Sequence, residues 1–209
     1  MKTKNFTKLI ALFLLLVFAG GGLKAQTEFA PYKSNVISYN GYSFPIIPGS
    51  DIWKNTSYSQ RVEMLQIPVD TLKNISTKRL LETCLYYPFN IDIFLCDNQS
   101  EGFYKVRNQF NGYVELFNRD DFIQELITLY SSRDVCFVEN INNDYERGQY
   151  SFDYKIMEIM ILEVLDSVSN QRSNQMANIV SEKQSQKAAY KEYYSNSNAA
   201  KQIINKSTR

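Results

Sequence analysis

The sequence predicts an all-α protein built as a compact array of short helices. Glycine is scarce, with 8 residues among 209, whereas a β-sandwich or β-barrel needs more turn glycines. Tyrosine (15) and phenylalanine (13) are abundant, which suits helices that pack through aromatic side chains. Apolar residues also recur at helical spacing in several segments. Because the expected helices are short and similar, a helical-repeat-like arrangement is an alternative, although no clean sequence period supports it.

The first 25 residues have the three regions of a secretory signal peptide. Lys2, Lys4 and Lys8 form a positive start, residues 9–18 are an unbroken apolar run, and Ala25 supplies the small residue before cleavage. The apolar run is too short for a stable transmembrane helix, which needs about 20 apolar residues. We therefore expect an exported protein, periplasmic or extracellular, with no transmembrane segment after cleavage.

The rest of the chain is expected to have three parts. These are an irregular N-terminal arm over 26–55, a helical core domain over 56–170, and a polar, basic C-terminal helix and tail over 171–209. The arm carries three prolines and the turn signal Asn40-Gly41, with apolar residues that lack helical spacing.

The segment 57–87 predicts three short helices in close succession. The first covers about 59–66 and ends before Pro68, which begins the second because proline suits the first helical position. Ser76 is the expected N-cap of the third, since serine side chains accept hydrogen bonds from helical N–H groups. Four residues form the buried stripe of this third helix: Leu80, Leu81, Cys84 and Leu85.

The segment 89–118 gives a mixed pattern. Its apolar run at 89–95 fits either a strand or a buried helical turn, and periodicity does not decide between them. Three residues further along recur at helical spacing: Phe103, Val106 and Phe110.

Two amphipathic segments follow. Residues 119–131 predict a helix with aspartates at its positive end, and residues 152–168 carry the strongest apolar stripe, which predicts the most deeply buried helix. The polar stretch 139–150 between them is expected to be a loop. Beyond residue 169 we expect a weakly amphipathic helix, with the last dozen residues disordered.

The near-neutral net charge of +1 hides an asymmetry. Residues 26–170 include 12 basic and 20 acidic side chains, whereas residues 171–209 include 7 basic and 2 acidic ones. One interpretation is a basic tail that folds back on an acidic body. The other is a tail that makes peripheral contact with an anionic surface such as lipid headgroups. Nucleic acid is not an expected partner, because the basic residues are thinly spread.

Three cysteines, Cys84, Cys96 and Cys136, leave two alternatives open. An exported chain could form one disulfide and keep one thiol, and the sequence does not choose the pair. Alternatively, all three are small apolar side chains without a bridge, which we favour because Cys84 lies on an apolar helical stripe.

The chain contains no histidine. This excludes the usual Ser-His-Asp and Cys-His hydrolases, zinc hydrolases with histidine ligands and histidine-ligated haem. The stretch 97–102 partly imitates a calcium loop, but Asn108 stands where that loop needs a bidentate glutamate, so we favour a polar turn. We expect no cofactor and no metal site.

Carboxylates are the remaining catalytic candidates. Four of them lie near aromatic residues in the middle of the chain: Asp92, Asp97, Glu101 and Glu115. A glycosidase needs two carboxyl groups about 5 to 10 Å apart. The alternative is a solvated acidic face over an aromatic core.

Aromatic residues in the same region are candidates for a binding surface, because aromatic side chains dominate binding hot spots. The candidates are Phe103, Tyr104, Phe110, Tyr113 and Phe117. The alternative, which we favour, is that they fill the core.

Several stretches are similar to uncharacterised exported, helix-rich proteins of Gram-negative bacteria. The stretches that carry the resemblance are 67–72 (IPVDTL), 75–77 (IST), 80–85 (LLETCL), 87–88 (YP) and 110–116 (FNGYVEL). The resemblance spans roughly residues 60–130. It implies an exported helix-rich protein and transfers no activity or site residue.

The sequence thus predicts a secreted or periplasmic, non-enzymatic helical domain that binds an unknown protein or envelope polymer. A carboxylate-dependent carbohydrate-active hydrolase is one alternative. A structural component of an envelope assembly, contacting lipid or another subunit through its basic tail, is another.

Overall fold

The computed structural model describes residues 40–207, and every regular element in this part of the chain is a helix. The all-α prediction is thereby confirmed. The elements are α2 (Asp51–Asn55), α3 (Tyr58–Met64), α4 (Val69–Asn74), α5 (Thr77–Leu85), η1 (Pro88–Leu95), α6 (Gln99–Gln109), α7 (Asn111–Phe117), α8 (Phe122–Ser132), η2 (Cys136–Asn140), α9 (Asp144–Val164), η3 (Leu165–Ser167), α10 (Asn170–Lys187), η4 (Ala188–Tyr190) and α11 (Asn198–Ser207). The α-helices range from 5 residues in α2 to 21 in α9, so they are less uniform than the units of a helical repeat.

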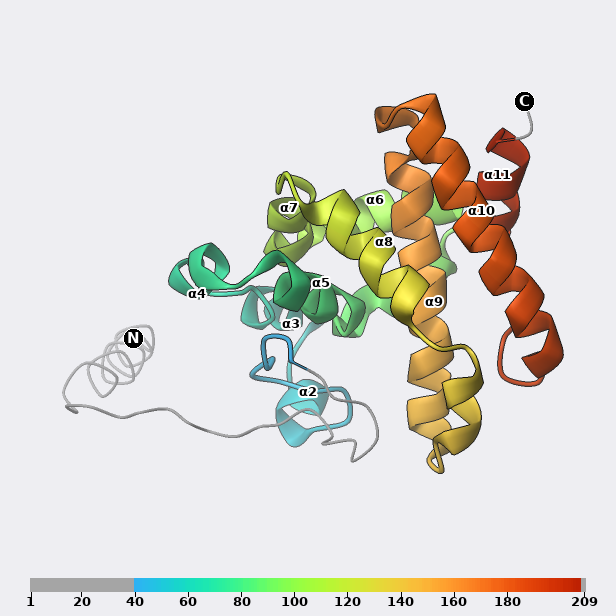
Figure 1. Ribbon diagram of the computed structural model, residues 1–209. Helices are drawn as coiled ribbons and strands as arrows, with labels where there is room; N and C mark the ends of the chain where they lie inside the picture. Colours follow the sequence, from blue (N-terminus) through green and yellow to red (C-terminus); the bar gives the residue numbers. More distant parts are fainter. Residues whose placement is uncertain (1–39, 208–209) are drawn as a thin grey trace, which may run out of the picture.

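The long helix α9 lies at the centre of the fold. In Figure 1, α8 crosses one side of α9, while α10 and α11 lie along another. Helices α5, α6, α8 and α11 all contact α9, and 12 of its 21 residues are buried. The prediction that this segment is the most deeply buried helix therefore agrees with the structure.

The expected loop at 139–150 is confirmed only for 141–143, because η2 extends to Asn140 and α9 begins at Asp144. The Asn143 side chain accepts a hydrogen bond from the backbone N–H of Glu146 (3.1 Å), so it caps the helix. Tyr150 is buried and donates a hydrogen bond to the carbonyl of Asp134 (2.6 Å). The cap and this distant contact stabilise residues 144–150 as the first two turns of α9, although the stretch is polar.

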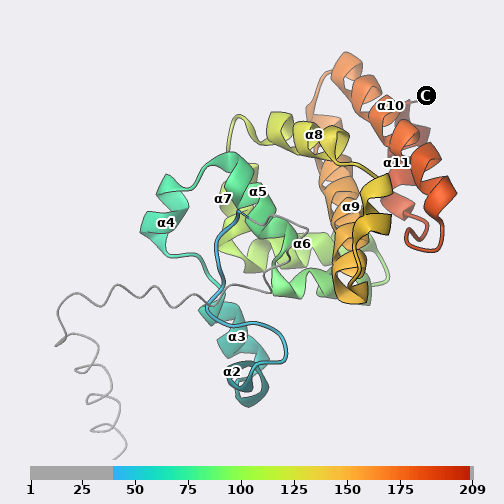
Figure 2. The same ribbon diagram turned by 60° about the horizontal axis from the view of Figure 1, so that its bottom comes forward.

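The three short helices predicted over 57–87 are present as α3, α4 and α5. Ser57 and Gln60 form a capping box at the start of α3, and Ser76 caps α5 through the backbone N–H of Arg79. Pro68 occupies the N-cap position of α4, one residue before its first helical residue. Figure 2 shows α2 and α3 at an edge of the molecule, away from α9.

The ambiguous run 89–95 is the 3₁₀ helix η1 and not a strand. It packs closely against α6, because a Cβ atom at Gly102 would clash with the backbone carbonyl of Ile93. Glycine at this position lets the two backbones meet.

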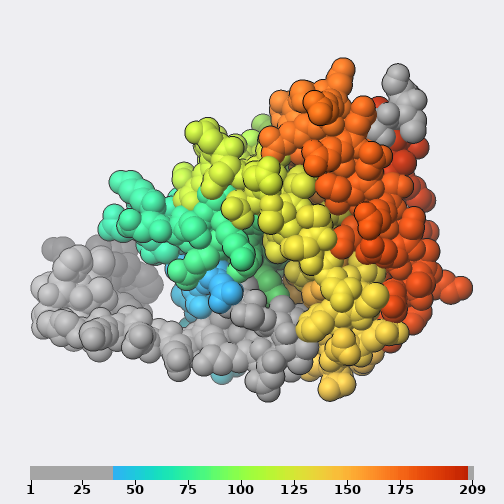
Figure 3. Space-filling view, in the orientation of Figure 1, coloured from blue at the N-terminus to red at the C-terminus, as the bar shows by residue number. Residues whose placement is uncertain are grey.

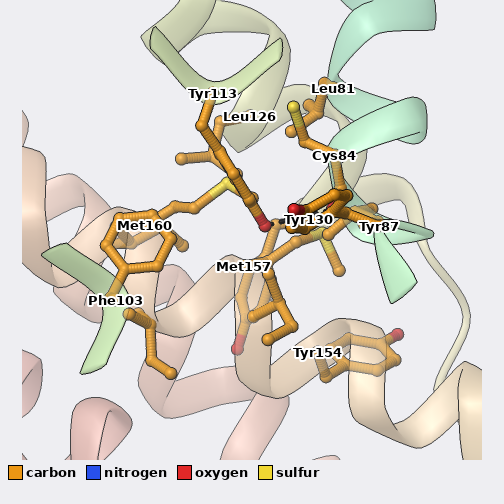
Figure 4. Close-up of a cluster of buried hydrophobic side chains, with 14 of the residues drawn as sticks. Leu81, Cys84, Tyr87, Phe103, Tyr113, Leu126, Tyr130, Tyr154, Met157 and Met160 are labelled. Atoms are coloured by element: carbon orange, nitrogen blue, oxygen red, sulfur yellow. Dashed lines mark hydrogen bonds between the residues drawn. The ribbon is translucent and has the colours of Figure 1, made fainter. Parts of the chain in front are cut away.

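The core is rich in aromatic side chains, which come from η1, α6, α7, α8 and α9 and from the connecting segments. Figure 4 shows side chains of α5, α6, α7, α8 and α9 converging on one cluster. The Tyr87 and Phe110 rings stack at 4.1 Å between centroids, and the Tyr113 ring meets each of them edge-on. Aromatic packing of this kind is what the unusual Tyr and Phe content predicts.

The signal peptide expected at 1–25 and residues 26–39 of the expected arm lie outside the described residues. Residues 40–49 are irregular as predicted, but α2 follows them, so the arm is helical at its end. Phe44 and Ile46 are buried in the core, and the backbone N–H of Tyr42 donates to the Thr83 hydroxyl (2.7 Å). These contacts bind the last part of the arm to α5.

The C-terminal residues fold back on the body as α10 and α11, and Figure 3 shows them (orange to red) lying against the yellow segment that ends α8. Disorder of the last dozen residues is wrong for 198–207, since Ala199, Ala200 and Ile203 are buried. Of the basic side chains, Lys183 and Lys187 are buried and Lys206 pairs with Asp166 (2.7 Å). This arrangement fits a tail that folds back on an acidic body.

All three cysteines are free thiols: Cys84 is buried, Cys96 is half-buried and Cys136 is exposed. Within residues 40–207, no helix combines the length and the apolar character needed to cross a membrane.

Candidate functional site

The four carboxylates suggested for catalysis lie on separate elements. Asp92 accepts a hydrogen bond from the Tyr58 hydroxyl (2.8 Å), and Asp97 is exposed in the turn between η1 and α6. Glu101 pairs with Lys105 (2.7 Å), which lowers the pKa of this carboxyl. No hydrogen bond or ion pair within the described residues joins any two of these four carboxylates.

The fourth carboxylate, Glu115, has a structural partner. Its Oε1 atom lies 3.1 Å from Nε of Arg119, whose other nitrogens donate to the carbonyls of Leu72 (2.8 Å) and Ile75 (2.6 Å). Glu115 thus orients an arginine that satisfies the carbonyl groups at the end of α4.

The aromatic candidates divide between core and surface. Phe103, Phe110 and Tyr113 are 0% exposed, so in this structure they fill the core and do not form a contact surface. The Tyr113 hydroxyl donates to Asn90 (2.9 Å), which places it among the buried hydrogen bonds that hold η1. Phe117 is half-buried beneath the guanidinium of Arg107 (4.1 Å to the ring centroid), and Tyr104 is 64% exposed.

A surface cavity of about 320 Å³ lies elsewhere, where the start of α9 meets the chain after η4. Its lining consists of Asp144, Arg147, Gly148, Ser151, Glu192 and Tyr193. We call these six residues the α9 cavity. The sequence reasoning missed it because four of its residues fall in or next to the stretch expected to be a loop.

Arg147 is the central side chain of the α9 cavity. Its guanidinium pairs with the exposed Asp144 carboxylate and lies over the Tyr193 ring, 5.6 Å from the centroid. The Nε atom of Arg147 is buried and has no hydrogen-bond partner among residues 40–207. The Nε atom is closed to solvent, whereas the Arg147 side chain as a whole is 28% exposed, so an acceptor that enters the cavity reaches the guanidinium through its other nitrogens.

Gly148 and Ser151 occupy the helical wall of the α9 cavity. The Ser151 hydroxyl donates to the carbonyl of Gly148 (2.9 Å), which directs it along the helix. A Cβ atom at Gly148 would meet nothing within 4 Å, so the helix has open space beside this residue.

A buried polar network behind the α9 cavity fixes its walls. Arg133, at the end of α8, lies 2.7 Å from the Asp153 carboxylate of α9, and Gln149 donates to the same carboxylate (2.7 Å). Burial raises the pKa of Asp153 to about 6, although Arg133 and Gln149 both act to lower it. Lys183 of α10 donates to the carbonyl of Arg133 (2.6 Å). The network thus joins α8, α9 and α10.

A second buried ion pair, between Glu158 of α9 and Lys187 of α10, extends this network. The same oxygen of Glu158 also accepts hydrogen bonds from Tyr130 (2.7 Å) and Gln184 (2.8 Å). Burial lowers the pKa of Lys187, and the nearby Glu158 opposes that shift. Both side chains are almost wholly buried, so they hold α10 against α9 at one register.

Tyr194 secures the other wall of the α9 cavity. Its hydroxyl donates to the carbonyl of Val135 (2.9 Å), and its ring meets the Tyr154 ring edge-on at 5.6 Å. Because Tyr193 precedes it directly, these contacts place the Tyr193 ring beside Arg147.

Compared with known proteins, the chain matches no family model, no curated protein and no solved structure. The resemblance over residues 60–130 therefore remains a prediction. In the part of the chain that the structure describes, histidine, cysteine, aspartate and glutamate side chains form no group of three that could hold a metal ion.

The α9 cavity offers acceptors on Asp144 and Glu192, donors on Arg147, and an aromatic surface on Tyr193. Such a set suits the non-covalent binding of a polar ligand, in which a few directed polar groups fix orientation.

Proposed function

We propose that the protein is an exported, non-enzymatic helical domain that binds a protein or envelope polymer through the α9 cavity. The observation that carries the proposal is that the partly exposed guanidinium of Arg147 lines a cavity with open space beside Gly148. The guanidinium provides donors for a ligand, and the open space provides room for it.

The rigidity of the surroundings supports this proposal. Each wall of the α9 cavity is held by buried contacts, on one side through Asp153 and on the other through Tyr194. A site whose walls are already ordered loses little conformational entropy when a ligand binds.

The test is crosslinking in intact producing cells with an affinity-tagged chain, followed by mass spectrometry of captured protein and sedimentation with isolated envelope polymer. Two variants form a matched pair. Gly148→Leu places a side chain in the open space, whereas Gly148→Ala adds one methyl group and leaves most of it free.

We expect the unmodified chain and Gly148→Ala to retain the partner and Gly148→Leu to lose it. Both variants must keep the helical circular dichroism of the unmodified chain. Capture that Gly148→Leu leaves unchanged, or the absence of any captured protein or polymer, would contradict the proposal.

A further inference from the structure

We propose that the α9 cavity is a subsite for a neutral sugar unit of a polysaccharide. This inference rests on the proposed function, and it narrows the partner to one chemical class. It follows from the size of the cavity, the kinds of groups that line it and their net charge.

The size of the α9 cavity suits one small ring-shaped unit. Its volume of about 320 Å³ is at the low end of pockets that hold small molecules, roughly 300–1,000 Å³. A folded protein partner buries a far larger area than such a cavity provides, typically about 800 Å² on each side. A polymer with a repeating small unit would place one unit in the cavity and continue across the surface.

The polar groups of the α9 cavity match the hydroxyl groups of a sugar. Each hydroxyl both donates and accepts a hydrogen bond, so a site for it needs acceptors and donors close together. Asp144 and Glu192 supply carboxylate acceptors, and Arg147 supplies a planar set of donors. The Arg147 side chain is 28% exposed, so part of its guanidinium is open to a hydroxyl oxygen.

Tyr193 supplies the apolar part of the recognition. A pyranose ring has faces of C–H groups, which carry a small positive charge and pack against the negative face of an aromatic ring. The Arg147 guanidinium lies over the Tyr193 ring, 5.6 Å from its centroid, so a sugar would pack against the part of the ring that the guanidinium leaves uncovered. A sugar presents the same combination, with hydroxyl groups at its edge and C–H groups on its face.

The charge of the α9 cavity selects among sugars. Two carboxylates, Asp144 and Glu192, outnumber the one guanidinium of Arg147, and Asp144 already pairs with that guanidinium. An anionic sugar such as a uronate would bring a further negative charge beside Glu192, which like-charge repulsion disfavours. A neutral hexose or N-acetylhexosamine avoids this repulsion.

The test is a nuclear magnetic resonance titration of the ¹⁵N-labelled chain with maltohexaose, cellohexaose, chitohexaose and hexagalacturonate. We expect one or more of the three neutral oligosaccharides to shift amide signals at 144–151 and 190–195, and hexagalacturonate to leave them unchanged. Gly148→Leu should weaken the interaction at least tenfold, and Gly148→Ala should change it less than twofold.

A second pair of variants tests the aromatic contact. Tyr193→Phe keeps the ring and should bind as the unmodified chain does, whereas Tyr193→Ala removes the ring and should weaken binding at least tenfold. The sugar site would be overturned if Tyr193→Ala and Gly148→Leu both bound as tightly as the unmodified chain. It would also be overturned if none of the three neutral oligosaccharides shifted the amide signals, or if hexagalacturonate shifted them equally.

These results are separable from those of the crosslinking experiment. If crosslinking shows a partner that Gly148→Leu abolishes but no neutral oligosaccharide binds, the sugar assignment fails and the proposed function stands. If capture is also insensitive to Gly148→Leu, both fail.

Discussion

The Arg133 guanidinium lies 2.7 Å from the buried Asp153 carboxylate and 3.9 Å from the centroid of the Tyr150 ring. This contact joins the end of α8 to the middle of α9 without an exposed charge, because the side chain of Asp153 is 0% exposed and that of Arg133 is 12% exposed. The carbonyl of Arg133 also accepts hydrogen bonds from Tyr154 (2.7 Å) and Lys183 (2.6 Å). One residue thus links three helices behind the α9 cavity.

Removing Arg133 should destabilise the protein in a pH-dependent way. Arg133→Met leaves a buried carboxylate without its cation, which costs about 3 to 5 kcal/mol. Burial already raises the folded-state pKa of Asp153 to about 6, above its usual value near 3.8, and losing Arg133 raises it further. Between the unfolded-state and folded-state pKa values, the folded state binds a proton that the unfolded state does not. The contribution of Asp153 to stability therefore falls as pH rises from the lower pKa to the higher one.

The measurement is the free energy of unfolding by urea at pH 5 and pH 8. We expect the loss in Arg133→Met to be smaller at pH 5 than at pH 8. The double variant Arg133→Met/Asp153→Leu removes both charges and should lack this difference. A loss that is equal at both pH values in the single variant would contradict the expected coupling.

Replacing each of two helical glycines with alanine should change the stability of the protein in opposite directions. Gly148→Ala should stabilise the protein by about 1 kcal/mol, because alanine favours the helix and its Cβ meets nothing within 4 Å. Gly102→Ala gains the same helical preference but forces its Cβ into the Ile93 carbonyl, so we expect a net loss of about 1 to 3 kcal/mol. Thermal unfolding measures both, and a stabilised Gly102→Ala would show that η1 and α6 are less closely packed than the structure indicates.

The three thiols should differ in their reaction with iodoacetamide. Cys136 is exposed and should react first, whereas Cys84 is buried and burial raises its pKa, which removes the reactive thiolate. Mass spectrometry of peptides after timed alkylation measures the three rates, and denatured protein, in which all three should react, is the control. Rapid modification of Cys84 in the folded protein would contradict its position in the core.

The last helix should contribute measurably to stability. Ile203 of α11 is 0% exposed, so Ile203→Ala should lower the free energy of unfolding by about 2 to 5 kcal/mol. Lys201 in the same helix is exposed, and Lys201→Ala should change stability by less than about 0.5 kcal/mol. Equal, small effects of the two changes would indicate that α11 does not pack on the body.

Helices could be predicted where the cap or the apolar stripe that marks them involves residues only a few positions apart in the sequence. The cap at Ser76 acts on a backbone group three residues away, and the stripe of α5 repeats within two turns. The aromatic candidates were only partly predictable, because one helical segment contains both Phe103 in the core and Tyr104 at the surface. Neighbouring positions on a helix face different directions, and the position of the surrounding helices decides which one is covered.

The sequence by itself determined the helical class, the positions of the capped and amphipathic helices, and the lack of histidine chemistry. Only the tertiary structure decided that 144–150 and 198–207 are helical and that Arg147 meets Tyr193. These features depend on partners far away in the sequence, such as the carbonyl of Asp134 for Tyr150. Local periodicity reports which residues can share a helix face, whereas burial and ion pairing between distant segments exist only once the chain has folded.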